Sequence, residues 1–266
     1  MADEVSLSGG NITSITRVGT TVRREPGPWT SATHDLLRYL ERAGFSGVPR
    51  VLGFDERGRE ILTFIEGVAG FFAPGETRPA NLWSDQVLIE AAAFLRRFHD
   101  ATLGFQAPPA ARWQMVFPDA GQHEVICHND FAPYNCIFAD GHLKAVIDFD
   151  TAGPGPRRWD LAYAAYRFVP LAASDKLPSI GAPAELNRGR RLKLFCDAYG
   201  LEQRHGLLDV IQERIDATRM MLIDGAASGN VGYQRILDEG GHIEGLRRDQ
   251  AFVEEQADEL QTWVDS

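Results

Sequence analysis

The chain has 266 residues, of which 44% are hydrophobic and 24% charged, and its formal net charge is −10. This length is sufficient for one large hydrophobic core or for two lobes, and no stretch approaches the roughly 18 consecutive apolar residues of a membrane-spanning helix. The acidic balance argues against nucleic acid as a partner, because phosphate backbones attract the opposite charge. It is compatible with a cationic small molecule, and equally with an ordinary contribution to solubility.

The cysteines and the N-terminal residues bear on the cellular compartment. The chain has three cysteines, an odd number, and they have no C-x-x-C spacing: Cys127, Cys136 and Cys196. They argue against a disulfide framework and against a zinc site, and they fit a reducing compartment. The segment Met1–Glu4 lacks the basic and apolar regions of a signal peptide. We therefore expect a cytoplasmic protein.

Residues 1–66 predict a small β-rich lobe of three strands, a helix and two further strands. The predicted strands are Val5–Ser8, Ile12–Val18, Thr21–Arg24, Val48–Phe54 and Glu60–Ile65. A helix from about Thr30 to Ala43 carries an apolar stripe of Leu36, Leu37 and Leu40. The turn Gly9-Gly10-Asn11 fits an ordinary hairpin loop and a phosphate cover equally well.

Residues 67–266 predict a larger lobe that is rich in helices. The predicted helices are 84–99, 161–169, 185–199, 208–225 and 247–264, with loops at 70–80 and 172–183, the second a candidate flexible flap. Three short strands interrupt them, at Val125–Cys127, Cys136–Phe138 and Leu143–Ile147. The dipeptide Asp140-Gly141 between the last two strands is a strong hairpin signal.

The motif with the clearest chemistry surrounds this hairpin. His128, Asp130 and Asn135 form the pattern H-x-D-x-x-x-x-N before it, and Asp148 and Asp150 form D-F-D after it. Protein kinases place an aspartate base and a metal-binding asparagine five residues apart on one loop, and a second metal-binding aspartate after the next hairpin. Asp and Asn also cap ordinary turns. The ordered set around one hairpin favours phosphoryl transfer, which requires an aimed acceptor hydroxyl and cations against the phosphate oxygens.

Two neighbouring segments extend this pattern. Residues 153–162 resemble a G-x-P…D-L-A segment, and Phe94–His99 resembles an L-x-x-L-H helix end. Together with the motif they resemble the aminoglycoside phosphotransferase and choline kinase-like family. The resemblance implies an α+β, protein-kinase-like two-lobed fold, with residues 1–66 as the nucleotide-binding lobe and residues 67–266 as the catalytic lobe. It also implies Mg²⁺, ATP or GTP as co-substrate, and a small hydroxyl-bearing acceptor.

The resemblance also implies roles for individual residues. Asp130 would orient and deprotonate the acceptor hydroxyl, while Asn135 and Asp148 would hold Mg²⁺. Asp150 lies on the same strand face as Asp148 and would assist the metal site through water, although a role that Thr or Gly could also fill fits this position equally well. His128 would support the catalytic loop. For Asp160, the family segment favours hydrogen bonds that anchor this loop over contact with substrate.

The resemblance places a hinge at Glu66-Gly67, directly after the last strand of the small lobe. On this alignment the backbone groups of Thr63 and Ile65 would hydrogen-bond the base of the nucleotide. A simple strand end at a glycine explains the same residues.

The kinase lysine and its partner glutamate are missing from the small lobe. All three lysines of the chain lie beyond residue 66, so an arginine has to hold the phosphates. We predict Arg23, which follows Val22 as the family lysine follows an apolar residue, and strand alternation turns Arg24 to the other face. The helix position of the glutamate falls on Thr33 or His34.

Two other functions compete with a kinase. The missing lysine and glutamate motivate a non-catalytic nucleotide-binding or immunity protein on the same scaffold, although the intact motif argues against it. A hydrolase with Cys127 and His128 has little support, since adjacent strand residues point apart. Within the kinase hypothesis, the sequence does not separate antibiotic modification from metabolic phosphorylation of choline, homoserine or a sugar.

Overall fold

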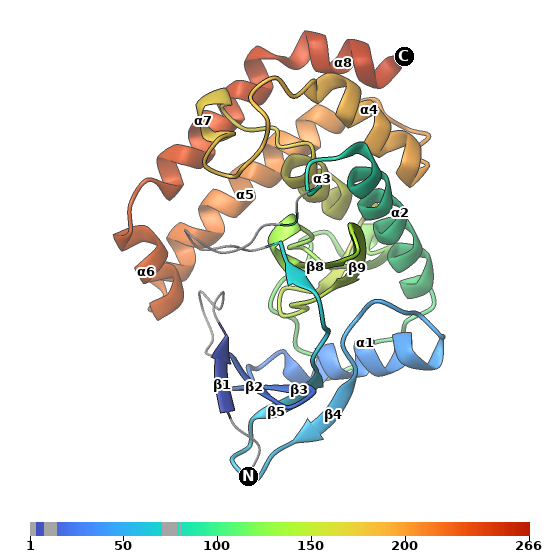
Figure 1. Cartoon of the computed structure of the whole chain (residues 1–266), viewed down its shortest axis with the longest axis vertical. Helices are drawn as coiled ribbons and strands as arrows, with labels where there is room; N and C mark the ends of the chain where they lie inside the picture. The colour runs from blue at the N-terminus through green and yellow to red at the C-terminus, as the bar shows by residue number, and fades with distance from the viewer. Residues whose placement is uncertain (1–3, 8–14, 71–78, 80) are drawn as a thin grey trace. The chain divides into compact units, whose positions relative to one another are not determined.

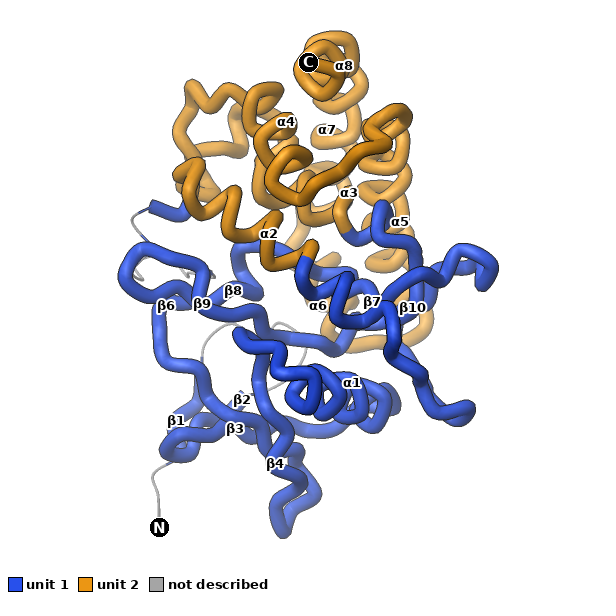
Figure 2. The backbone as a smooth tube through the Cα atoms, turned by 90° about the vertical axis from the view of Figure 1, so that its right-hand side faces the viewer, with its two compact units in different colours: residues 1–82, 97–160 blue, residues 83–96, 161–266 orange. Residues whose placement is uncertain are grey.

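The computed structural model describes residues 4–7, 15–70, 79 and 81–266. Its internal contacts divide the chain into two compact units, Met1–Leu82 with Arg97–Asp160, and Trp83–Arg96 with Leu161–Ser266 (Figure 2). The combination of a sheet-containing unit with a helical unit confirms the predicted α+β class. The units do not coincide with the predicted lobe boundary at residue 66, which stays a prediction.

A five-stranded antiparallel sheet forms the N-terminal part of the first unit, in the order β1-β2-β3-β5-β4 (Figure 1). The strands are β1 (Glu4–Leu7), β2 (Ile15–Val18), β3 (Thr21–Arg24), β4 (Val51–Phe54) and β5 (Glu60–Thr63). Three strands, a helix and two strands were predicted in this order, and this is confirmed. The predicted turn at residues 9–11 lies outside the described residues, as does most of the predicted loop at 70–80.

Helix α1 (Thr30–Arg42) lies between β3 and β4 in the chain. The predicted stripe is confirmed, because Leu36, Leu37 and Leu40 are each at most 1% exposed. Burial of these three leucines fixes the rotation of the helix about its axis. His34 is also buried, although a histidine is polar.

Two small sheets frame the predicted catalytic segment within the same unit. β7 (Val125–Cys127) pairs with β10 (Gly153–Gly155), and β6 (Val68–Ala69), β8 (Cys136–Ala139) and β9 (His142–Val146) form a three-stranded sheet. The predicted hairpin is confirmed, with Asp140 and Gly141 at positive φ angles of 51° and 81° between β8 and β9. The segment 128–135 therefore connects β7 to β8, and Asp148 follows the end of β9.

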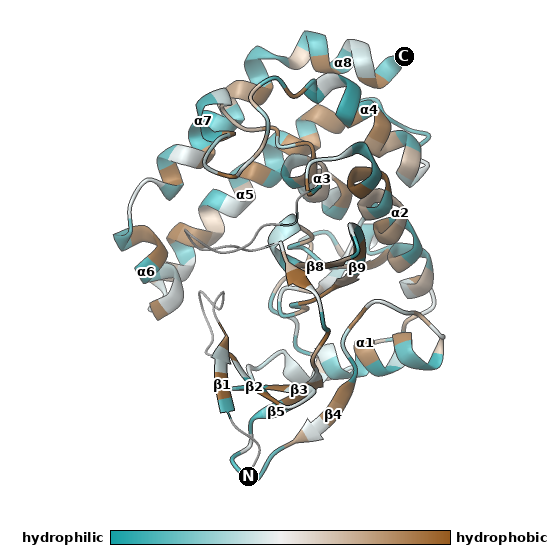
Figure 3. Ribbon diagram, in the orientation of Figure 1, coloured by the Kyte–Doolittle hydropathy of each residue, from teal (hydrophilic) through white to brown (hydrophobic). Residues whose placement is uncertain are grey.

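The second unit is helical. It contains most of α2 (Asp85–Thr102) and α3 (Arg157–Phe168), followed by α4 (Arg188–Tyr199), α5 (Leu207–Ala227), α6 (Val231–Asp238), α7 (His242–Glu255) and α8 (Ala257–Asp265). Figure 3 shows hydrophobic and hydrophilic residues on different faces of α2, as its predicted apolar spacing requires. The helix predicted at 247–264 is divided at Gln256, and α6 was not predicted. Within the described ranges, no helix is long and apolar enough to cross a membrane.

The predicted flap at residues 172–183 is hydrogen-bonded to α7 at its beginning. The buried carboxylate of Asp249 accepts hydrogen bonds from the Lys176 ammonium at 2.7 Å and from the Ala173 N–H at 3.1 Å. The Tyr166 hydroxyl donates to the same carboxylate at 2.7 Å. These contacts, all within the second unit, hold the start of the segment in place.

Candidate active site

The loop between β7 and β8, residues 128–135, is held at its start by a buried carboxylate. Asp160 accepts hydrogen bonds from the backbone N–H groups of His128 at 2.7 Å and Asn129 at 2.8 Å, and from His99 Nε2 at 3.0 Å. These bonds support Asn129 in a left-handed conformation with φ of 64°. Asp160 therefore holds the backbone that leads into Asp130.

Asp160 keeps its negative charge although it is completely buried. Burial acts to raise the pKa of this carboxyl, but the hydrogen bonds from the His99 side chain and from the backbone N–H of His128 outweigh it, so that the pKa is lowered. The charged form is thus the one that the fold stabilises.

His128 joins the two halves of the predicted site. Its Nδ1 accepts the backbone N–H of Asp130 at 3.3 Å, and its Nε2 donates to the carbonyl of Ile147 at 3.1 Å. This pattern requires the neutral tautomer with hydrogen on Nε2. Because Ile147 directly precedes Asp148, one imidazole fixes the backbone at the predicted base and at the predicted metal ligand.

Asp130 lies at the centre of the loop, and both of its carboxylate oxygens accept hydrogen bonds. The amide nitrogen of Asn135 donates to Oδ2 at 2.8 Å and to the backbone carbonyl of Asp130 at 3.0 Å. The hydroxyl of Tyr134 donates to Oδ1. Asp130 and Tyr134 are both half-buried, so part of each residue is exposed to solvent.

Asp148 and Asp150 lie beside the side chain of Arg24. The Arg24 guanidinium reaches Asp150 at 2.6 Å and Asp148 at 3.4 Å. Asp148 adopts a left-handed backbone conformation with φ of 63°, and its side chain is 46% exposed. A non-glycine residue in this conformation marks a constrained turn, here one that presents a carboxylate to solvent.

The structure does not bring the predicted phosphate residue, Arg23, to the two aspartates. Arg24, and not Arg23, faces the two aspartates; Arg23 contacts the hydroxyl of Thr21 at 2.6 Å and lies 3.9 Å from Asp55. The expected alternation of the two arginines is present, but the face that meets Asp148 is the opposite one. Alternation alone determines the relative orientation of the two side chains and cannot say which face of β3 lies toward Asp148 and Asp150.

The missing helix glutamate has a substitute on a neighbouring strand. Glu60 lies directly opposite Arg24 in the pairing of β3 with β5, and their charged groups are 2.5 Å apart. The second oxygen of Glu60 contacts His34 Nε2 of α1 at 2.8 Å. His34 occupies one of the two positions at which we expected the glutamate. The chain thus connects strand and helix through Arg24, Glu60 and His34, and Glu60 became recognisable only once the strand pairing was known.

The charges of this cluster shift the ionisation of its members. Burial, with the nearby carboxylates of Asp148 and Glu60, raises the pKa of Asp150 to about 6, although Arg24 opposes the shift. Burial acts to lower the pKa of Arg24, but Asp150, Asp148 and Glu60 raise it above its ordinary value. Arg24 is therefore a permanent cation among three carboxylates.

The residues proposed to hold Mg²⁺ fit such an ion. Asn135 and Asp148 are brought close through the backbone, since the N–H of Ile147 donates to the Asn135 carbonyl at 2.9 Å. Because the amide nitrogen of Asn135 binds Asp130, its oxygen is left for a cation, and oxygen donors are what Mg²⁺ prefers. Among the described residues, no group of three or more His, Cys, Asp or Glu side chains is arranged to hold a metal. A site with one carboxylate and one amide leaves the other positions to phosphate oxygens and water.

At the predicted hinge, the backbone N–H of Thr63 is already used. It donates to the carbonyl of Arg50 at 3.0 Å, so only the carbonyl of Thr63 is left for a nucleotide base, and Ile65 lies two residues beyond the end of β5. Gly67 has φ of 152°, and a side chain there would lie 2.6 Å from the carbonyl oxygen of Phe138. The close approach of the chain to β8 therefore requires glycine at this position.

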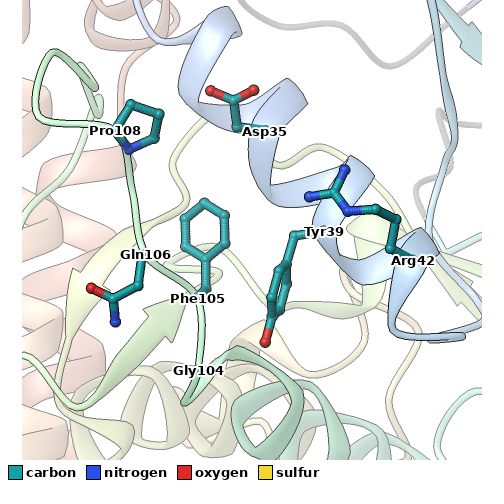
Figure 4. Close-up of a pocket in the computed structure, with 7 residues that line it drawn as sticks. All are labelled: Asp35, Tyr39, Arg42, Gly104, Phe105, Gln106 and Pro108. Carbon is teal, nitrogen blue, oxygen red and sulfur yellow. The ribbon is translucent and has the colours of Figure 1, made fainter.

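A separate hollow of about 350 Å³, open to solvent, lies between α1 and the segment that follows α2 (Figure 4). The rings of Tyr39 and Phe105 meet edge to face there, with their centroids 5.2 Å apart. It is lined by Asp35, Tyr39, Arg42, Gly104, Phe105, Gln106 and Pro108, none of which belongs to the predicted site.

Known proteins are similar to this chain in sequence and in fold. The model of the phosphotransferase enzyme family matches residues 106–177, which include the loop 128–135 and Asp148. The trifolitoxin immunity protein of Rhizobium leguminosarum bv. trifolii is 40% identical over 216 residues, 79% of each chain. The chain belongs to the phosphotransferase enzyme family.

Solved structures extend the likeness across nearly the whole chain. A choline/ethanolamine kinase family protein from Mesorhizobium loti covers 100% of this chain and 94% of its own, with a TM-score of 0.62 and 16% identity. The GDP complex of aminoglycoside 2'-phosphotransferase-IIIa covers 94% of this chain and 92% of its own, with a TM-score of 0.62 and 15% identity. At these identities the likeness concerns the fold, and it confirms the protein-kinase-like fold that the sequence predicted.

Proposed function

We propose that this member of the phosphotransferase family transfers the γ-phosphoryl group of ATP or GTP to a hydroxyl of a small molecule in the cytoplasm. The observation that carries the proposal is the position of His128, whose two ring nitrogens bond the backbone of Asp130 and of Ile147. A base and a metal ligand from separate loops are thereby held together. Phosphoryl transfer depends on such positioning more than on covalent chemistry.

Each residue has a defined role in this proposal. Asp130 accepts a hydrogen bond from the acceptor hydroxyl and takes its proton as the oxygen attacks phosphorus. Asn135 and Asp148 would hold Mg²⁺, which, when bound, would neutralise charge on the phosphate oxygens. Asp150, paired with Arg24 at 2.6 Å, would assist this metal site.

Arg24 replaces the missing lysine as the phosphate-binding cation. Its edge toward Asp148 makes the longest of its ion contacts, at 3.4 Å, and this is the edge that a phosphate oxygen can share. The carbonyl of Thr63 and the backbone of Ile65 are the proposed contacts to the base.

The test is a screen for nucleoside diphosphate release with ATP and with GTP. The acceptor panel contains aminoglycosides, macrolides, choline-like amines and sugars, and Asp130→Asn serves as the control. We expect at least one acceptor to raise diphosphate release in the wild type and not in the variant. If no nucleotide binds in the presence of Mg²⁺, the proposal is wrong.

The likeness to a trifolitoxin immunity protein supports a second candidate function, in which the chain protects a cell from a toxin by binding it. Expression of the wild type and of Asp130→Asn in toxin-sensitive cells separates the two functions. If both proteins protect, binding is sufficient and transfer is unnecessary. If only the wild type protects, the toxin or a related molecule is the acceptor.

A further inference from the structure

Tyr134 makes a contact with the base that the motif does not require. The motif leaves the four positions between Asp130 and Asn135 unspecified, yet the hydroxyl of Tyr134 donates to Oδ1 of Asp130. The amide of Asn135 occupies Oδ2 at 2.8 Å. The carboxylate that would receive a proton during transfer is therefore hydrogen-bonded at both oxygens by the chain itself.

The contact has the chemistry of a bound acceptor. During transfer an acceptor hydroxyl donates a hydrogen bond to the aspartate before it attacks. The phenol of Tyr134 is also a hydroxyl that donates to this aspartate. It lies on the short helix η2 (Pro133–Asn135), and its half-buried side chain has exposed surface from which it can be displaced.

We propose that Tyr134 guards Asp130, holding the position that the acceptor hydroxyl takes and so restricting the reaction to acceptors able to displace it. The inference rests on the proposed function. Water makes few contacts and gains little by replacing a phenol bonded to a carboxylate. A larger acceptor adds contacts of its own, which offset the loss of that bond.

The reaction that Tyr134 would suppress is the hydrolysis of the nucleotide by water. In hydrolysis the oxygen of water bonds to the γ-phosphorus while the bond from that phosphorus to the β–γ bridging oxygen breaks. The water proton passes to Asp130, and the products are nucleoside diphosphate and inorganic phosphate. Transfer to an acceptor follows the same sequence with the acceptor oxygen in place of water, so Tyr134 is a specificity-determining residue that acts through Asp130.

The test is Tyr134→Phe, which removes only the hydroxyl. We measure release of inorganic phosphate from ATP and from GTP with Mg²⁺ and without acceptor, and nucleotide affinity by calorimetry. A hydrogen bond to a charged group corresponds to roughly 10–150-fold in an equilibrium, so hydrolysis should rise by about tenfold or more at unchanged nucleotide affinity. Tyr39→Phe is the matched control, since Tyr39 lines the separate hollow of Figure 4, and its hydrolysis should not change.

Unchanged or slower hydrolysis in Tyr134→Phe would overturn the guard, because a residue that only positions Asp130 would slow the reaction when removed. Tyr134→Leu repeats the measurement if the phenylalanine variant does not fold. The added hydrolysis must disappear when Asp130→Asn is combined with Tyr134→Phe. If the wild type binds nucleotide and transfers phosphate but Tyr134→Phe hydrolyses no faster, the guard fails and the proposed function stands; if nucleotide does not bind, both fail.

Discussion

Arg24→Ala should destabilise the protein far more than Arg23→Ala, although both arginines lie on β3. The Arg24 side chain is only 8% exposed and contacts Glu60 at 2.5 Å, Asp150 at 2.6 Å and Asp148 at 3.4 Å. Removing one partner of a buried ion pair costs about 3–5 kcal/mol, because the remaining charge stays buried. For a chain of this size we therefore expect Tm to fall by roughly 6–20 °C. Arg23→Ala should change stability by about 1 kcal/mol or less, since its ion contact with Asp55 is 3.9 Å long.

The variants Arg24→Ala and Arg23→Ala also test which arginine contacts the phosphates of the nucleotide. Loss of a charge-assisted bond should weaken ATP or GTP binding by roughly 10–150-fold while adenosine or guanosine binding is unchanged. Arg24→Lys keeps the cation and retains part of the affinity, which makes the test possible if the alanine variant unfolds. Calorimetry with triphosphate and nucleoside measures both quantities. An equal loss for Arg23→Ala, or no loss for Arg24→Lys and Arg24→Ala, would refute the assignment of Arg24.

Three further outcomes are expected. Asp130→Asn should lower kcat by about 10²–10⁴-fold with nucleotide affinity retained, because it keeps the shape and removes the proton acceptor; comparable kcat would remove Asp130 from the mechanism. Asp148→Ala should abolish the effect of Mg²⁺ on nucleotide affinity, measured by titration with and without the metal; a wild type indifferent to Mg²⁺ would contradict the assignment. Asp160→Asn should reduce the free energy of unfolding at pH 7 by roughly 1.5–3 kcal/mol. Because the folded pKa of Asp160 is lowered from 3.8, its contribution to stability is present above pH 3.8 and is lost as the pH falls through the folded pKa. Urea unfolding at pH 3 should therefore show a smaller difference in stability between wild type and variant than at pH 7. A difference that does not change with pH would be evidence against the pKa shift.

The sequence by itself predicted a candidate catalytic segment and most of the secondary structure. His128, Asp130, Asn135 and Asp148 lie within a short stretch around one hairpin, and the turn at Asp140-Gly141 is a local signal. Helix α1 was readable because its apolar spacing matches its buried face. These features depend on interactions between residues close in the chain. The division of the last predicted helix at Gln256 and the existence of α6 escaped the same reasoning, because both depend on packing among the C-terminal helices.

Only the tertiary structure decided which groups surround the motif. Strand alternation predicted that Arg23 and Arg24 point apart, but packing of the sheet against the segment at Asp148 selected Arg24. Glu60 is 36 positions from Arg24 in the chain and became its partner through the pairing of β3 with β5. Tyr134 is near Asp130 in sequence, yet its contact depends on the turn of η2. The physical reason is the same for all three residues. A charged or polar side chain pairs with the groups that folding brings within hydrogen-bond distance, and a local sequence pattern does not contain that distance.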